Sequence, residues 1–275
     1  MNAEPTNAQA QELPKTSVPR RGISVGPERN KPPIGKEMVS LIPFFFDPQG
    51  GLHVAFVLNV DGIKPERFGL IGGMRTADGT ETIPKAAQKE GMQEAGLDLL
   101  HEDIHTVFGV VKKSRMRDVN DKETGESGYI EQFVCMVPGL RQLLNTSSSE
   151  VLYPRWVPFR SILSGEKRIF FVEEAGAHFG YRGIFISHLF VLLEALREMG
   201  ENFALFAKKE LPRKHPFFRL CAEGLAPFVQ NDSSGGTYRV LDALCTLDVD
   251  GVMRKYFPSF DPPSFRENFT RYDTE

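Results

Sequence analysis

The segment KEGMQEAGL, from Lys89 to Leu97, constrains the fold of this chain more than any other stretch. It completes a pattern that predicts a helix from about Ile83 to Ala95. Pro84 is tolerated in the first turn of such a helix, and Gly96 is a typical C-terminal stop. The chain is therefore expected to contain an amphipathic helix in this region, and not a strand.

The predicted helix carries two acids on its packed face. At 3.6 residues per turn, Glu90 and Glu94 share a narrow sector with Ile83 and Ala87, which are suited to packing on a sheet. Two carboxylates one turn apart repel each other, and burial strengthens the repulsion. A divalent cation removes the conflict, and oxygen ligands favour Mg²⁺ or Mn²⁺. The alternative is a surface helix with two solvated acids.

Strand patterns lie on both sides of this helix. A polar loop is expected from Ser114 to Gly128, and a long helix is expected in GIFISHLFVLLEALREM, residues 183–199. The predicted strands lie in MVSLIPFFF (38–46), LHVAFVLNV (52–60), RFGLIGG (67–73), IHTVFGVVKK (104–113), YIEQFVCMVPG (129–139) and PRWVPF (154–159). Strands mixed with helices in this way predict an α/β protein.

The two ends of the chain differ in composition. Residues 1–36 are rich in Pro, Gly, Asn, Gln and charge, which predicts a disordered tail. Residues 201–275 contain many phenylalanines, which favour a packed helical extension, either an appendage or a partner-binding surface. Within it, residues 242–257 are expected to form one helix, and QNDSSGG and PSFDPPSF are expected to be loops.

The stretch from Gly73 to Leu97 resembles the Nudix box. That pattern reads Gly, five residues, Glu, seven residues, Arg-Glu, an apolar residue, any residue, Glu-Glu, any residue, Gly and an apolar residue. The matching positions are Gly73, Glu81, Lys89-Glu90, Gln93-Glu94 and Gly96-Leu97. The resemblance covers residues 37–200 and implies a Nudix-type α/β/α sandwich with a mixed β-sheet.

This box departs from the family pattern at four places. Seven residues, and not five, separate Gly73 from Glu81. Lys89 replaces an arginine whose planar fork holds neighbouring acids, a geometry that lysine is not expected to copy. Gly91 stands where a larger apolar residue usually packs, and Gln93 replaces one of the metal-facing acids.

The resemblance implies a metal-dependent hydrolase of a nucleoside diphosphate-linked compound, which cleaves the pyrophosphate bond. Mg²⁺ or Mn²⁺ would be held by Glu90 and Glu94, with Gln93 offering a carbonyl oxygen, and Glu81 would support these ligands from behind. Glu90 is thus both a metal ligand and a catalytic residue. The alternative is a catalytically impaired Nudix-fold protein that binds nucleotides as a sensor or scaffold.

The general base and the substrate contacts are further candidates. Glu150 lies six residues before Trp156, where some family members carry their base; Glu131, Glu173 and Glu174 are weaker alternatives. Gly72 and Gly73 allow close approach of the backbone to a metal or phosphate. The candidate phosphate contacts at the end of one strand are Lys113, Arg115 and Arg117, with a solvated hairpin arm as the alternative.

Charge and cysteine content narrow the partners. The net charge of −3 gives no general attraction to nucleic acid or to membranes, so neither a membrane nor a sequence-specific nucleic-acid partner is expected. The three separated cysteines indicate reduced thiols in a cytoplasmic protein. A nucleotide-type small molecule is the expected ligand, and a homodimer or a protein partner could use the C-terminal extension.

Overall fold

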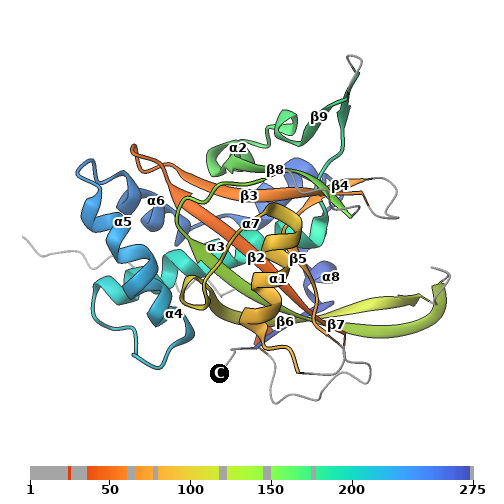
Figure 1. Cartoon of the computed structure of the whole chain (residues 1–275), viewed down its shortest axis with the longest axis horizontal. Helices are drawn as coiled ribbons and strands as arrows, with labels where there is room; N and C mark the ends of the chain where they lie inside the picture. Colours follow the sequence, from red (N-terminus) through yellow and green to blue (C-terminus); the bar gives the residue numbers. More distant parts are fainter. Residues whose placement is uncertain are drawn as a thin grey trace, which may run out of the picture.

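A computed structural model describes residues 24–25, 36–60, 66–76, 80–117, 123–144, 150–174 and 178–272 of the chain. Figure 1 shows a central sheet with α1 (Ile83–Ala95) against one face and α3 (Ile186–Ala207) against the other. The predicted α/β architecture with a mixed sheet between helices is confirmed.

The main sheet combines antiparallel and parallel pairs. Its strands are β1 (Ser24–Val25), β2 (Lys36–Phe46), β3 (Leu52–Asn59), β4 (Arg67–Gly69), β5 (Ile71–Met74), β6 (His105–Arg117), β7 (Glu123–Pro138), β8 (Val151–Pro158) and β11 (Phe269–Tyr272). Their order is β1-β11-β6-β7-β2-β3-β4, with β5 paired to β2 and β8 paired to β3. The central β2–β7 pair is parallel, which places both strands deep in the sheet. A separate hairpin joins β9 (Phe171–Glu174) to β10 (His178–Tyr181).

Helix α1 has the bounds and the C-terminal glycine that its sequence predicts, and the structure adds Thr82 as its N-cap. The hydroxyl of Thr82 accepts a hydrogen bond from the Lys85 N–H at 3.4 Å, and Pro84 lies in the first turn. Gly96 ends the helix with φ 63°, a left-handed conformation that glycine adopts without a Cβ penalty. These local signals fix where the helix begins and ends. Its packed face, which carries the candidate acids, lies against β5.

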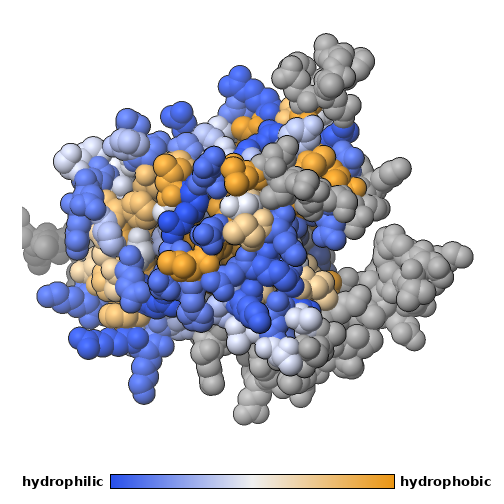
Figure 2. All heavy atoms as spheres, viewed as in Figure 1, coloured by the Kyte–Doolittle hydropathy of each residue, from blue (hydrophilic) through white to orange (hydrophobic). Residues whose placement is uncertain are grey.

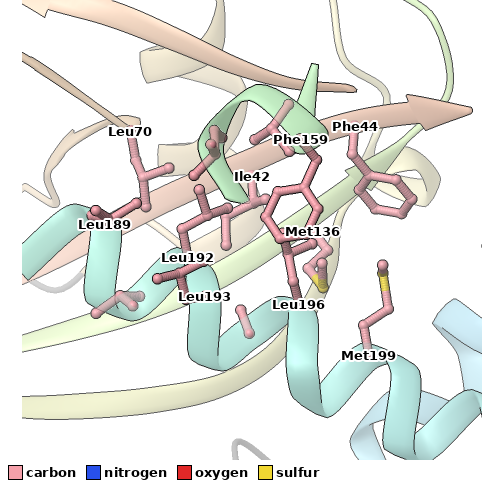
Figure 3. Packing of buried hydrophobic residues seen from close by; sticks show 14 of the residues in the cluster. Ile42, Phe44, Leu70, Met136, Phe159, Leu189, Leu192, Leu193, Leu196 and Met199 are labelled. Atoms are coloured by element: carbon pink, nitrogen blue, oxygen red, sulfur yellow. The ribbon is translucent and has the colours of Figure 1, made fainter. Parts of the chain in front are cut away.

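Hydrophobic clusters lie on both faces of the sheet, and the two larger ones involve α1 and α3. The smaller of these two packs Ala87 and Ala95 of α1 against residues such as Leu41 and Val57. The larger one packs α3 against the opposite face, and Figure 3 shows Leu192 and Leu196 of α3 turned toward that sheet. α3 therefore covers one face of the sheet, and α1 with the candidate acids covers the other.

Two predicted boundaries near the sheet are wrong. The loop expected from Ser114 to Gly128 is largely strand, because β6 and β7 continue their pairing through Ser114–Gly128 and Arg115–Ser127. The segment RFGLIGG forms two strands, β4 and β5, and not one. It divides at Leu70, whose N–H donates to His188 Nδ1 at 2.9 Å in place of a strand partner.

The C-terminal part is mainly helical, as expected, and it also contributes residues to the core and a strand to the main sheet. Helix α3 runs through the boundary expected at Gly200 and ends at Ala207. The following elements are α4 (Pro216–Arg219), the π-helix η3 (Leu220–Leu225), α5 (Ala226–Asn231), α6 (Gly236–Leu244), α7 (Val249–Tyr256) and α8 (Pro262–Arg266). β11 then joins the main sheet beside β6, so this part shares the core and the sheet of the residues before it.

Two loop and helix predictions in this part are corrected. Residues 242–257 are not one helix, because α6 ends at Leu244 and α7 begins at Val249 after Asp248 caps it by accepting from the Gly251 N–H at 2.9 Å. PSFDPPSF contains the short helix α8, for which Pro262 supplies a preset φ in the first turn.

Most of the predicted N-terminal tail lies outside the described residues. Within it, Ser24–Val25 pairs in parallel with β11, and Lys36 opens β2. On the face seen in Figure 2, small groups of hydrophobic side chains lie between wider hydrophilic areas. No helix in the described part of the chain is long and apolar enough to cross a membrane.

Candidate metal and phosphate site

The two glycines in the middle of β5 lie against the two acids of α1. The Gly72 N–H donates to Glu94 Oε2 at 2.7 Å. A Cβ on Gly73 would lie 2.5 Å from Glu90 Oε2, and a Cβ on Gly72 would lie 2.0 Å from the Val39 carbonyl oxygen. Only glycine fits at position 72, and a Cβ at position 73 would displace the Glu90 carboxylate, so the backbone of β5 and the two carboxylates form one closely packed site.

Lys89 joins the outer acid of the box to the inner one. Its ammonium lies 3.2 Å from Glu90 Oε1 and 3.4 Å from Glu81 Oε2. It also donates to the Met74 carbonyl oxygen at 3.2 Å. Lys89 therefore contacts two box acids through one ammonium group, without the planar fork that an arginine would offer.

Arg75 is a supporting residue that the sequence reasoning missed. Its Nε donates to the Glu81 carbonyl oxygen at 3.1 Å, and its guanidinium pairs with Glu37 of β2. Together with the Thr76 N–H, which donates to Glu81 Oε2 at 2.9 Å, it fixes the position of Glu81. The sequence feature that could have indicated this role is the position of Arg75, a cationic residue between Gly73 and Glu81.

Glu90 and Glu94 are both buried, at 8% and 6% exposed. Burial raises the pKa of Glu94 to about 8, and the nearby charges of Glu90 and Glu150 act in the same direction. Burial likewise raises the pKa of Glu90, against the opposing effect of Lys89. A bound cation would favour the ionised form of both groups.

Glu81 titrates in the opposite direction. Burial alone would raise its pKa, but the hydrogen bonds from Thr76 and the ammonium of Lys89 outweigh that effect and lower the pKa. Glu81 thus stays ionised beside Lys89. It also holds the ammonium of Lys89 in place. The charges of Glu90 and Glu94 are compensated less by the protein than the charge of Glu81 is.

The two altered positions on α1 lie in different environments. Gln93 is exposed, whereas Gly91 is buried with room for little more than a Cβ, which would lie 3.1 Å from Leu99 Cδ1. The small residue at 91 therefore matches close packing of α1 against Leu99 and Leu41. The metal-ligand role of Gln93 stays a prediction.

Glu150 lies close enough to the two acids for its charge to act on both. Its carbonyl oxygen accepts from the Val60 N–H at 2.8 Å, which ties the start of β8 to the end of β3. The alternatives fit less well. Glu131 lies on β7 and is 4% exposed, and the side chains of Glu173 and Glu174 are outside the described residues. Which of them is a base stays a prediction.

The predicted phosphate contacts lie on β6, in the part that forms a hairpin with β7. Lys113 is exposed on β6 and donates its backbone N–H to the Asn268 carbonyl oxygen at 3.0 Å. Arg115 and Arg117 lie further along the same strand, with side chains outside the described part. Figure 1 shows the β6–β7 hairpin extending beyond the rest of the sheet. Substrate contact through this arm stays a prediction.

The carboxylates of Glu90 and Glu94 could provide part of the coordination of a metal ion whose other ligands are water and substrate phosphates. Within the described ranges, no group of three or more His, Cys, Asp or Glu side chains is placed to bind a metal ion. Mg²⁺ commonly takes only one or two carboxylates and completes its coordination with water and substrate phosphates. The pair Glu90 and Glu94 suits such a site, and a closed protein cage is not present among these residues.

The box residues lie on β5 with its two glycines, at Glu81 before α1, and on α1 with the remaining acids. Solved structures that resemble the chain come from Nudix-type proteins. A MutT/nudix family protein from Enterococcus faecalis is 13% identical, with 86% of this chain and 84% of that chain covered and a TM-score of 0.43. NrtR from Shewanella oneidensis is 16% identical, with 76% and 78% covered and a TM-score of 0.43.

The NUDIX domain of Shewanella oneidensis NrtR, solved as a complex with ADP ribose, is a further similar structure. It is 13% identical, with 60% of this chain and 89% of that chain covered and a TM-score of 0.42. No protein-family model matches the chain, and no curated protein matches it. A likeness this distant says nothing about activity, which depends on the residues at the site.

Proposed function

We propose that this protein is a metal-dependent hydrolase that cleaves the pyrophosphate bond of a nucleoside diphosphate-linked compound. Glu90 and Glu94 would hold Mg²⁺ or Mn²⁺, with the amide oxygen of Gln93 as a neutral ligand. The proposal is supported mainly by one observation: two buried carboxylates lie against the glycine backbone of β5, with Glu150 close enough to raise the pKa of both.

Each residue has a task that follows from its position. Gly72 orients Glu94 through its N–H, and Gly73 leaves space for the Glu90 carboxylate. Lys89 fixes the other side of Glu90. When bound, a divalent ion would neutralise phosphate charge and lower the pKa of water. Glu150, exposed at the start of β8, is the proposed acceptor of the proton from the attacking water.

A panel of nucleoside diphosphate compounds that includes ADP-ribose tests the proposal. Hydrolysis is expected with Mg²⁺ or Mn²⁺ and is expected to stop with a chelator. Glu94→Gln should lower kcat by about a hundredfold or more, since it removes a charged ligand. Asp98→Asn is the matched control, because Asp98 is an exposed acid three residues past α1. Equal turnover by Glu94→Gln and by the parent protein would overturn the proposal.

Gln93→Glu is the complementary change. It adds a third carboxylate beside Glu90 and Glu94, so it should tighten Mg²⁺ binding and raise turnover, because the cation offsets the added repulsion. Without metal, the same change should lower the melting temperature. Differential scanning calorimetry with Mg²⁺ and with chelator measures both effects. If the melting temperatures of Gln93→Glu and Glu94→Gln are both insensitive to Mg²⁺, this helix does not bind metal.

A nucleotide-binding protein without turnover is the second candidate. It is favoured by the neutral Gln93 and by the ammonium of Lys89, which already compensates part of the charge of Glu81 and Glu90. Calorimetric titration with ADP-ribose in the presence of chelator separates the two. Tight binding that needs no metal, together with intact ligand after long incubation, supports the second candidate.

A further inference from the structure

The ammonium group of Lys89 lies among three oxygen atoms from three neighbouring segments. Glu90 Oε1, on the same helix, is 3.2 Å from the lysine Nζ, and Glu81 Oε2, ahead of the helix, is 3.4 Å from it. The Met74 carbonyl oxygen, at the end of β5, accepts a hydrogen bond from the same nitrogen at 3.2 Å. Because an ammonium group has three N–H donors, these three oxygens match its full capacity for hydrogen bonds.

The same three oxygens are ligand types that a divalent cation prefers. Mg²⁺ and Mn²⁺ favour carboxylate and carbonyl oxygens. The side chain of Lys89 is 36% exposed, whereas Glu81 and Glu90 are 7% and 8% exposed, so the lysine reaches from solvent to buried acids. Shortening the contacts to the roughly 2.1 Å of a Mg²⁺ ligand needs a shift of about 1 Å, which glutamate side chains allow. The position of the ammonium is therefore suited to a metal ion whenever the lysine charge is removed.

The other side of the acid pair is oriented by backbone and not by Lys89. A Cβ on Gly73 would lie 2.5 Å from Glu90 Oε2, and Glu94 Oε2 accepts from the Gly72 N–H at 2.7 Å. No ion pair in the described part of the chain joins Lys89 to Glu94. The ammonium thus compensates Glu81 and one oxygen of Glu90, and it leaves the second oxygen of Glu90 and the whole of Glu94 to another cation.

We propose that the ammonium of Lys89 fills a second cation position, so that this chain binds one divalent ion where an uncharged residue at position 89 would let it bind two. The proposal deepens the proposed function and rests on it for the ion at Glu90 and Glu94. Lys89 is a positioning residue in this arrangement. It holds Oε1 of Glu90, which turns Oε2 toward the ion, and it sets the number of ions at the site.

Titration of the full chain with Mn²⁺ tests the proposal, with the bound ions counted from the electron paramagnetic resonance signal of free Mn²⁺. One bound ion is expected for the parent and two for Lys89→Met, which keeps an unbranched side chain but has no charge. Lys89→Arg keeps the charge and should bind one. Lys85→Met is the matched control, because it removes an exposed lysine one turn earlier on α1, and it should also bind one.

Thermal unfolding of the same variants gives a second readout. In chelator, Lys89→Met leaves the buried Glu81 and Glu90 without their cation, so its melting temperature should fall below that of Lys85→Met. Saturating Mn²⁺ should raise the melting temperature of Lys89→Met by about 5 °C more than that of the parent, because an additional ion binds only the folded state. Adding Glu81→Gln to Lys89→Met removes one carboxylate ligand, and this double variant should again bind one ion.

The ion counts separate this inference from the proposed function. Two ions in the parent, or equal counts in Lys89→Met and the parent, would overturn the inference. An additional ion in Lys85→Met would overturn it as well, because the effect would then come from the general charge of the helix. A parent that binds no ion, beside a Lys89→Met variant that binds one, would contradict the proposed function and support the role of Lys89. A Lys89→Met chain that is unfolded in chelator supports the inference if Mn²⁺ restores folding and overturns it if Mn²⁺ does not.

Discussion

Glu94 is the residue whose environment gives the clearest prediction. Its folded pKa of about 8 lies above the usual value of 4.5, so the folded metal-free protein keeps a proton that the unfolded chain releases. The free energy of unfolding should therefore fall as pH rises from about 4.5 to about 8, and then remain low. Below pH 4.5 the group makes no difference, since both states are protonated.

Glu94→Gln should abolish this part of the pH dependence. The amide oxygen of glutamine can still accept from the Gly72 N–H, but it carries no charge to bury. In chelator at pH 8, the variant should be more stable than the parent by about 1–3 kcal/mol, and the two should converge near pH 4.5. Chemical denaturation at several pH values measures this difference. A parent protein whose stability does not decrease across this window would contradict the prediction.

The candidate site was predictable from the sequence where residues act through their spacing. Glu90 and Glu94 could be placed on one buried face because helical periodicity is local, and Gly96 marked the end of that helix. Contacts from distant segments were not predictable in this way. The bond from Arg75 to the Glu81 carbonyl depends on how the loop folds back, and the approach of Glu150 depends on the pairing of β8 with β3.

At the scale of elements, α3 is joined to the C-terminal part by ion pairs. Arg266 of α8 lies 3.4 Å from Glu194 Oε1 and 3.1 Å from Asp250 Oδ2, and its guanidinium lies 5.3 Å from the centre of the Phe190 ring. Glu194 is 3% exposed and also pairs with Arg197 at 2.6 Å. This buried network, together with the phenylalanines around it, fixes α7 and α8 against α3.

Arg266→Ala should lower the free energy of unfolding by about 2–3 kcal/mol. The loss comes from leaving the partly buried Asp250 and the buried Glu194 without this partner, and Arg197 limits it by staying paired with Glu194. Arg254→Ala is the matched control: it removes an exposed arginine from α7 and should change stability by less than about 0.5 kcal/mol. Urea unfolding of both variants provides the comparison, and equal effects would show that the network contributes nothing.

Element boundaries were predicted well where local signals were strong and poorly where pairing decided them. Pro84 in the first turn and Gly96 at the C-terminus mark the limits of α1, so these limits followed from the sequence. The β6–β7 hairpin, in contrast, continues through a polar segment that has no apolar alternation, because each strand supplies backbone partners to the other. The short α8 and the strand β11 are likewise set by tertiary contacts, which override weak local preferences.

The larger hydrophobic core contains residues from both sides of the domain boundary that was expected at residue 200. Phe217 and Phe269 come from the C-terminal part, and Val54 and Val110 come from the sheet, yet all four belong to the same cluster. The composition of residues 201–275 indicated packing, but it could not show that β11 completes the sheet beside β6. A segment that contributes both core residues and a strand paired to β6 is expected to be required for folding.

Deleting the N-terminal residues and deleting the C-terminal part are expected to have different effects on folding. Deletion of residues 208–275 removes α4 to α8 and β11, which exposes the apolar face of α3 and the edge of β6 to water. The truncated chain should therefore lose cooperative unfolding and aggregate, since large apolar surfaces and open strand edges associate. Deletion of residues 1–23, which are poor in large apolar residues, should change the melting temperature by no more than about 2 °C. Calorimetry and size-exclusion chromatography of both deletions give the answer. A folded, monomeric protein that ends at residue 207 would show that the C-terminal part is an appendage, and its contacts with α3 would then contribute little to the stability of the sheet.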